Sequence, residues 1–145
     1  MSQKIKIMIL GGARENGKNM YAVQVEDEIF IMDAGLKYPD SSLLGIDVVI
    51  PDLDFFRDYG DKIAGIFLTH GHADSIGALP YILRDYDIPV FGSKLTIELA
   101  KIAVQRENRR RKNDLFHVID EDTEIEFKNA NVSFFKTTHS IPDSL

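Results

Sequence analysis

The first third of the chain alternates short apolar runs with polar turns. Residues 5–10 (IKIMIL) end at a Gly-Gly pair, and residues 21–25 (YAVQV) are followed, after a polar turn, by residues 29–35 (IFIMDAG). Short runs of this kind, rich in β-branched side chains and bounded by turn residues, are typical of strands. The pattern therefore predicts three strands over the first 35 residues.

The middle of the chain changes to helical spacing after one buried strand. Residues 36–56 carry prolines, a glycine and scattered acids, which predict a long ordered loop with a brief helical turn near residues 53–57. Residues 63–69 (IAGIFLT) predict a buried strand. The spacing of residues 76–86 predicts a helix that accommodates a proline in its first turn, and we expect the side chain of Asp74 or Ser75 to cap it.

The last third returns to strands around one long helix. Residues 88–92 predict a strand, and residues 93–107 predict an amphipathic helix capped by Ser93. Three further β-type runs are expected at residues 115–119, 123–127 and 131–138. This order of strands and helices predicts an α/β fold of the layered α+β kind, in one domain over residues 1–145.

Composition narrows the class of protein. The chain has 145 residues, is 44% hydrophobic and carries a net charge of −6, which argues against a surface that coats nucleic acid but leaves room for a local basic groove. It has no cysteine, so a metal site must use His, Asp and Glu, and a reducing cytosol fits. The apolar run at the start is too short to cross a membrane, so we expect a cytoplasmic protein.

Two histidines and an aspartate follow the predicted buried strand at residues 70–74 (HGHAD). Residues two apart in an extended segment project to the same side, so His70, His72 and Asp74 can face one ion. His139 follows another β-type run and could reach the same edge of the sheet. Imidazole and carboxylate donors suit zinc or manganese, and a bound divalent ion lowers the pKa of water from 15.7 to about 7. The pattern predicts a metal-dependent hydrolase, whereas a single histidine of this kind would indicate only a hydrogen bond to a loop.

Three other features are more typical of structural roles. His117 lies within an apolar run and is expected to be a core or surface histidine. The basic run at residues 106–112 (RENRRRK) ends the long helix, where cations favour the helix dipole, and an RNA contact is the alternative. Residues 11–19 (GGARENGKN) could cradle a phosphate, but they lead into a strand, so a structural turn is favoured.

Residues 69–81 (THGHADSIGALPY) resemble the HxHxDH signature of the metallo-β-lactamase superfamily, and specifically its ribonuclease J branch. The segments GGARENGKN, IMDAGLKYPD, LLGIDVVIPD and TTHSIPDS resemble the same branch in the same order, so the resemblance covers essentially the whole chain. It implies the amino-terminal half of an αββα sandwich, in a bacterial cytoplasmic enzyme that processes and degrades RNA from the 5′ end or internally. It also implies two metal ions, zinc or manganese, and β-CASP and carboxy-terminal domains beyond this amino-terminal part.

The resemblance assigns roles to individual residues. His70, His72 and His139 match the ligands of one ion. Asp74 matches a ligand of the other ion and is the residue expected to be catalytic. Asp33 matches an aspartate that sits beside the site and supports its ligands, a role worth about 10 to 100-fold in affinity or activity.

Ser75 stands where the family pattern has its last histidine. A hydroxyl is a poor replacement for an imidazole, so the second ion is expected with reduced or absent occupancy. Arg14 and Asn16 also depart from the family pattern. These departures resemble the second, degenerate ribonuclease J paralogue of Gram-positive bacteria, which pairs with a more active sister subunit. We therefore expect a weakly active RNA-processing subunit that forms hetero-oligomers with its sister as well as homo-oligomers, and no nuclease activity for residues 1–145 alone.

Three alternatives remain open at this stage. The protein could be a fully active metallonuclease, or a non-catalytic structural or RNA-binding partner of an active sister ribonuclease. A hydrolase of small molecules shares the metal motif, but the flanking segments resemble the RNA branch.

Overall fold

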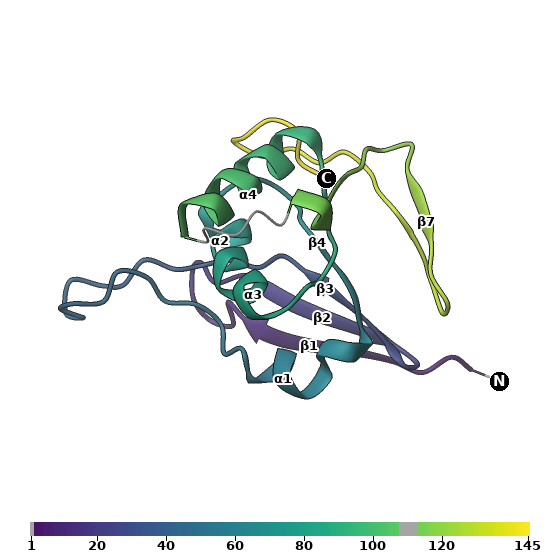
Figure 1. Cartoon of the computed structure of the whole chain (residues 1–145), viewed down its shortest axis with the longest axis horizontal. Helices are drawn as coiled ribbons and strands as arrows, with labels where there is room; N and C mark the ends of the chain where they lie inside the picture. Colours follow the sequence, from purple (N-terminus) through teal and green to yellow (C-terminus); the bar gives the residue numbers. More distant parts are fainter. Residues whose placement is uncertain (1, 108–112) are drawn as a thin grey trace.

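The structure is a computed structural model, and it describes residues 2–107 and 113–145. Its centre is a six-stranded sheet in the order β1-β2-β3-β4-β5-β6. Strands β1 to β4 of this sheet are labelled in Figure 1. The first three strands pair antiparallel, and β3 to β6 run parallel. The strands are β1 (Ile5–Gly11), β2 (Met20–Val25), β3 (Glu28–Met32), β4 (Ile63–Phe67), β5 (Val90–Gly92) and β6 (Phe116–Val118).

Helices cover one face of this sheet and enclose the main core. They are α1 (Asp54–Tyr59), α2 (Ala73–Ile76), α3 (Leu79–Asp85) and α4 (Lys94–Glu107), with single 3-10 turns at Gly60–Lys62 and Asn113–Leu115. Phe56, Ile66, Leu79 and Ile97 meet there with no exposed surface, and each such side chain stabilises the fold by roughly 1.5–3 kcal/mol. Within the described part of the chain, no helix is long and apolar enough to cross a membrane.

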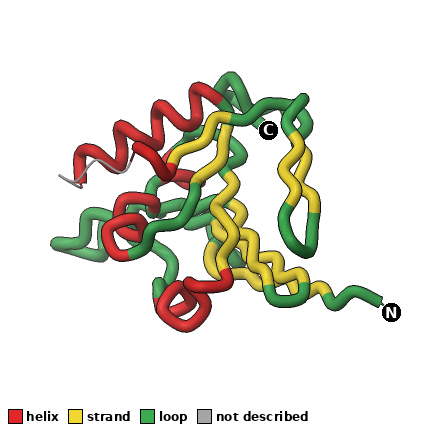
Figure 2. Tube along the Cα trace, turned by 45° about the vertical axis from the view of Figure 1, so that its right-hand side comes forward, coloured by secondary structure: helices red, strands yellow, loops and turns green. Residues whose placement is uncertain are grey.

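A hairpin of two strands packs on part of the opposite face. It consists of β7 (Glu124–Glu126) and β8 (Asn131–Ser133), and Figure 2 shows it as a separate strand pair beside the sheet. Phe127 meets Phe30 with ring centroids 5.1 Å apart, and Phe67 stacks on Phe91 at 4.9 Å. The hairpin does not reach β1, whose alternate residues Ile5, Ile7 and Ile9 are 60%, 70% and 61% exposed. The layers are therefore helices, sheet and a partial second sheet.

The prediction of a layered α/β fold is correct, but the prediction of one continuous helix over residues 76–86 is wrong. It is two short helices, because the amide of Ala78 donates to the carbonyl of Ala34 at 2.7 Å and the chain turns at Gly77. The expected cap is also wrong, since α2 begins after His72 without a side-chain cap and both Asp74 and Ser75 lie inside it.

The predictions for residues 131–138 and for the basic run at residues 106–112 have different outcomes. The strand expected at residues 131–138 ends at Ser133, because its partner β7 begins at Glu124, directly opposite. The basic run at residues 106–112 lies mostly outside the described residues, and its first two members end α4.

Candidate metal centre

The carboxyl ends of β3 and β4 place the first residues of the candidate site. The two strands pair in parallel, and the amide of Asp33 donates to the carbonyl of Phe67 at 2.9 Å. Asp33, Thr69 and His70 therefore leave neighbouring strands at the same edge, where α/β proteins usually bind ligands. Both Asp33 and His70 are buried, with 7% and 8% of their surface exposed.

Backbone hydrogen bonds fix α2 against the segment that follows β3. Ala34 donates to the carbonyl of Ser75 at 2.8 Å, and the amide of Asn19 donates to the carbonyl of Asp74 at 3.1 Å. The approach is so close that a Cβ on Gly35 would lie 1.6 Å from the carbonyl oxygen of Asp74. Glycine at position 35 therefore allows the turn that carries Asp74 to reach the site.

The last nine residues bring His139 to the same place. The amide of Leu145 donates to the carbonyl of Thr69 at 2.9 Å, and that of Thr137 donates to Ser144 at 3.0 Å. The Oγ of Ser93 also lies 2.6 Å from the carbonyl oxygen of Asp143, which ties this segment to the start of α4. Sequence analysis expected His139 at the end of a strand, whereas a folded-back loop delivers it.

Three imidazoles meet as the sequence predicted. The ring centroids of His70 lie 5.0 Å from His72 and 4.1 Å from His139, and those of His72 and His139 are 4.9 Å apart. One nitrogen from each ring falls within 4.8 Å of the others, so among the described residues these three could hold a metal ion. Zinc bonds of about 2.0–2.1 Å in tetrahedral geometry would bring such nitrogens to about 3.3 Å. Side-chain rotations that move these nitrogens by roughly 1.5 Å would bring them to the separation that a zinc ion requires.

Two buried polar atoms beside the cluster show that a cation fits there. Neither Nε2 of His70 nor Oδ1 of Asp74 has a hydrogen-bond partner in the described structure, although the two atoms lie 3.4 Å apart. Buried groups of this kind normally have partners, and both can donate electron pairs to a cation. Burial, followed by the charge of His139, lowers the pKa of His70, which keeps its imidazole neutral and able to bind metal at neutral pH.

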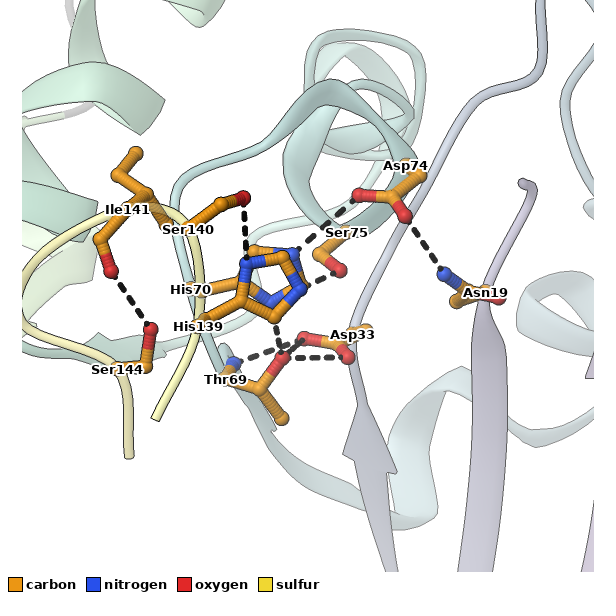
Figure 3. Close-up of polar contacts among 10 residues, drawn as sticks. All are labelled: Asn19, Asp33, Thr69, His70, Asp74, Ser75, His139, Ser140, Ile141 and Ser144. Carbon is orange, nitrogen blue, oxygen red and sulfur yellow. Dashed lines mark hydrogen bonds and ion pairs between the residues drawn. The ribbon is translucent and has the colours of Figure 1, made fainter. Parts of the chain in front are cut away.

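Hydroxyl groups link His70 to the buried carboxylate behind it (Figure 3). The Oγ1 of Thr69 lies 2.9 Å from Nδ1 of His70 and 2.9 Å from Oδ2 of Asp33. The amide of Thr69 donates to Oδ1 of Asp33 at 2.8 Å. The Oγ of Ser75 approaches the same Nδ1 at 3.4 Å. Asp33 thus lies behind His70, joined to its ring through the hydroxyl of Thr69.

Asp33 is held in an unfavourable environment. Its φ is 62°, in the left-handed region that non-glycine residues rarely adopt. Burial raises the pKa of its carboxyl group to about 6, against the lowering effect of the hydrogen bonds from Thr69. Such cost is typical of residues kept for function rather than for stability.

Sequence reasoning missed Asn19 and Thr69. The Nδ2 of Asn19 donates to Oδ2 of Asp74 at 3.3 Å, so it orients the carboxylate whose other oxygen faces the histidines. The only signals were that Asn19 ends the glycine-containing turn and that Thr69 directly precedes the histidine motif. His117 lies outside the cluster as predicted, exposed on β6 with its ring stacked on Phe91.

Comparison with known proteins identifies the family to which this chain is similar. The family model described as the Metallo-beta-lactamase superfamily matches residues 13–142. Among solved structures, a B3 metallo-β-lactamase with an active-site glutamic acid is similar with a TM-score of 0.56 at 14% identity, over 88% of this chain and 47% of that chain. At that identity the likeness shows the fold alone.

Similarity in sequence is much higher to curated bacterial proteins. The chain is 60% identical over 141 residues to ribonuclease J 2 of Streptococcus pyogenes, and 50% identical over 144 residues to ribonuclease J 2 of Staphylococcus epidermidis. These alignments cover 97% and 99% of this chain but 26% of each relative. The chain therefore spans about a quarter of the length of the curated relatives that it matches.

Proposed function

Because the chain belongs to the metallo-β-lactamase superfamily and has the sequence of its ribonuclease J branch, we propose that it forms the metal-binding part of a weakly active ribonuclease subunit that processes and degrades RNA. The observation that carries this proposal is the meeting of His70, His72 and His139 beside a buried serine at the position of a fourth histidine. The whole protein would be cytoplasmic and would act in a complex with a more active sister subunit and with further copies of itself.

His70, His72 and His139 would hold one zinc or manganese ion. Such an ion supplies a Lewis acid for the phosphodiester and lowers the pKa of water. The chain's own contribution is to present three imidazoles and to hold the turn between β4 and α2 rigidly through backbone hydrogen bonds. His139 is the exposed member, so the carboxy-terminal loop that carries it decides whether the set is complete.

Asp74 is the proposed catalytic carboxylate. Asn19 fixes its Oδ2, and its Oδ1 faces the histidines without a hydrogen-bond partner among the described residues. That oxygen can accept the proton of an attacking water or contribute to holding a second ion. Ser75 supplies no imidazole to that second ion, and this is the reason for the low activity proposed here.

RNA would approach through the cleft beside Asp74. This cleft has a volume of about 400 Å³ and is lined by Asn16, Gly17, Leu36, Lys37, Tyr38 and Asp74. Lys18 and Lys37 both pair with the carboxylate of Glu15, at 2.9 and 3.2 Å, and Lys37 is the cation in the lining of the cleft. The ammonium group of Lys37 can pair with a phosphodiester, and the exposed ring of Tyr38 offers a face on which a base can stack.

The test of this proposal is RNA hydrolysis by a protein of the family's length that carries this chain. We expect slow cleavage of a labelled single-stranded RNA that EDTA abolishes and that His70→Ala abolishes. His117→Ala is the matched control, since that histidine is exposed and lies outside the cluster. Hydrolysis that survives both EDTA and His70→Ala would contradict the proposal.

A second candidate is a non-catalytic partner of an active sister ribonuclease. The observation that favours it is again Ser75, together with the open apolar face of β1 as a surface for another chain. Under this candidate, affinity capture of the sister would be unchanged by replacing His70, His72 and Asp74, and RNA turnover by the complex would be unchanged as well. A loss of turnover in that triple variant with capture intact would favour the catalytic proposal.

A further inference from the structure

Ser75 is not an empty ligand position in this structure. Its side chain has no exposed surface, and its backbone carbonyl is held by the amide of Ala34 at 2.8 Å. Its Oγ lies 3.4 Å from Nδ1 of His70, on the side of the ring away from the metal-facing nitrogen. A hydroxyl buried so completely needs a hydrogen-bond partner, and the described structure provides one in the ring of His70.

Two hydroxyls therefore stand between one carboxylate and one imidazole. Thr69 bridges Asp33 and Nδ1 of His70, with distances of 2.9 Å on both sides. The Ser75 hydroxyl lies beside the same ring nitrogen, and it lowers the pKa of the Asp33 carboxyl. With Asp33 as final acceptor, these groups favour the tautomer of His70 that carries its proton on Nδ1 and leaves Nε2 free.

We propose that Ser75 is a positioning residue for His70, and that the site is organised around one metal ion rather than being a two-ion site with a ligand missing. This inference rests on the metal site of the proposed function and gives Ser75 a role in it. Replacing Ser75 by histidine would remove the hydroxyl that lies beside Nδ1 of His70. It would therefore lower the affinity for the first ion while offering a ligand to a second ion.

The first test measures zinc alone, by competition with a chromophoric chelator. Groups that orient a metal-binding histidine are typically worth 10 to 100-fold in affinity, and we expect Ser75→Ala to weaken zinc binding about 10-fold. Ser133→Ala is the matched control, since Ser133 is exposed on β8 in the separate two-stranded sheet, and it should leave the affinity unchanged. Circular dichroism of each variant checks that the fold is kept.

A double-mutant cycle separates positioning from simple packing. If Ser75 acts through Asp33, then Ser75→Ala made in an Asp33→Asn background should cause much less than the 10-fold loss seen alone. The full 10-fold loss in both backgrounds would overturn the inference. Zinc affinity unchanged by Ser75→Ala, with Ser75→His binding two ions and the first as tightly as before, would overturn it as well.

A third measurement needs no metal and no activity. Nitrogen-15 spectra of the histidine rings in EDTA report the tautomer of His70, and we expect the proton on Nδ1, with part of that preference lost in Ser75→Ala. A His70 ring protonated on Nε2 in the parent chain, or a preference unaffected by Ser75→Ala, would contradict the inference. Failure of the RNA hydrolysis test leaves these ring measurements unaffected, so the two proposals fail separately.

Discussion

Asp33→Asn should raise the free energy of unfolding, relative to the parent chain, more at alkaline pH than at acid pH. It should do so although it removes a residue that supports the site. Burial raises the pKa of this carboxyl from 3.8 to about 6. The folded state therefore binds the proton more tightly than the unfolded state, and the stability that this gives is present below pH 4 and lost as the pH rises through 6. A difference of about 2.2 pKa units corresponds to about 3 kcal/mol between the fully protonated and fully ionised limits.

Asparagine has the same shape and no charge, so its variant escapes this loss. Its Oδ1 can still accept the amide hydrogen bond from Thr69. We expect the free energy of unfolding of Asp33→Asn, relative to the parent chain, to rise by about 2 kcal/mol between pH 4.5 and pH 8. Urea unfolding in EDTA at both pH values measures this change. A relative stability that is the same at the two pH values would refute the reasoning that Asp33 is an ionised group in a costly environment.

Three other predictions follow from packing and exposure. Gly35→Ala should destabilise the chain by about 3 kcal/mol in urea unfolding, because the new Cβ would meet the carbonyl oxygen of Asp74 at 1.6 Å. Gly45 has a positive φ but no atom of a described residue within 4 Å of an added Cβ, so Gly45→Ala should cost about 1 kcal/mol. Equal losses in the two variants would contradict this account. Ile7→Lys should reduce self-association in sedimentation experiments with little change in unfolding, since Ile7 is 70% exposed on an open apolar face, and unaltered association would show that this face is not responsible. Tyr38→Ala, in a protein of the family's length, should weaken binding of single-stranded RNA at least 5-fold in fluorescence anisotropy, as expected for one lost stacking contact; unchanged binding would remove Tyr38 from the RNA path.

The sequence predicted elements whose signal is local. The opening three strands and the long helix α4 follow from hydrophobic period and turn residues, and both are present. The histidine motif at the end of a buried strand also predicted correctly which edge of the sheet gathers the candidate ligands. His70 and His72 lie two residues apart, so their convergence needs no knowledge of the fold.

Features that depend on distant segments were not readable in the same way. The split between α2 and α3 arises because Ala34, which is far from α3 in sequence, takes the amide of Ala78. Asn19 reaches Asp74 across 55 positions, and no local pattern indicates that pairing. Asp74 and Ser75 are residue types that often cap helices, but both lie inside α2 and contact Asn19 and His70 instead. Local sequence preferences indicated a capping role for these two side chains, but long-range packing determined which residues they contact.

The histidine cluster has a direct test in the zinc stoichiometry of the chain at neutral pH. We expect one zinc ion per chain, lost on His70→Ala and on His139→Ala and retained on His117→Ala, because the first two residues belong to the cluster and the third is exposed on β6. No bound zinc, or zinc that remains after His70→Ala and His139→Ala, would contradict the single-ion site on which the proposed function depends.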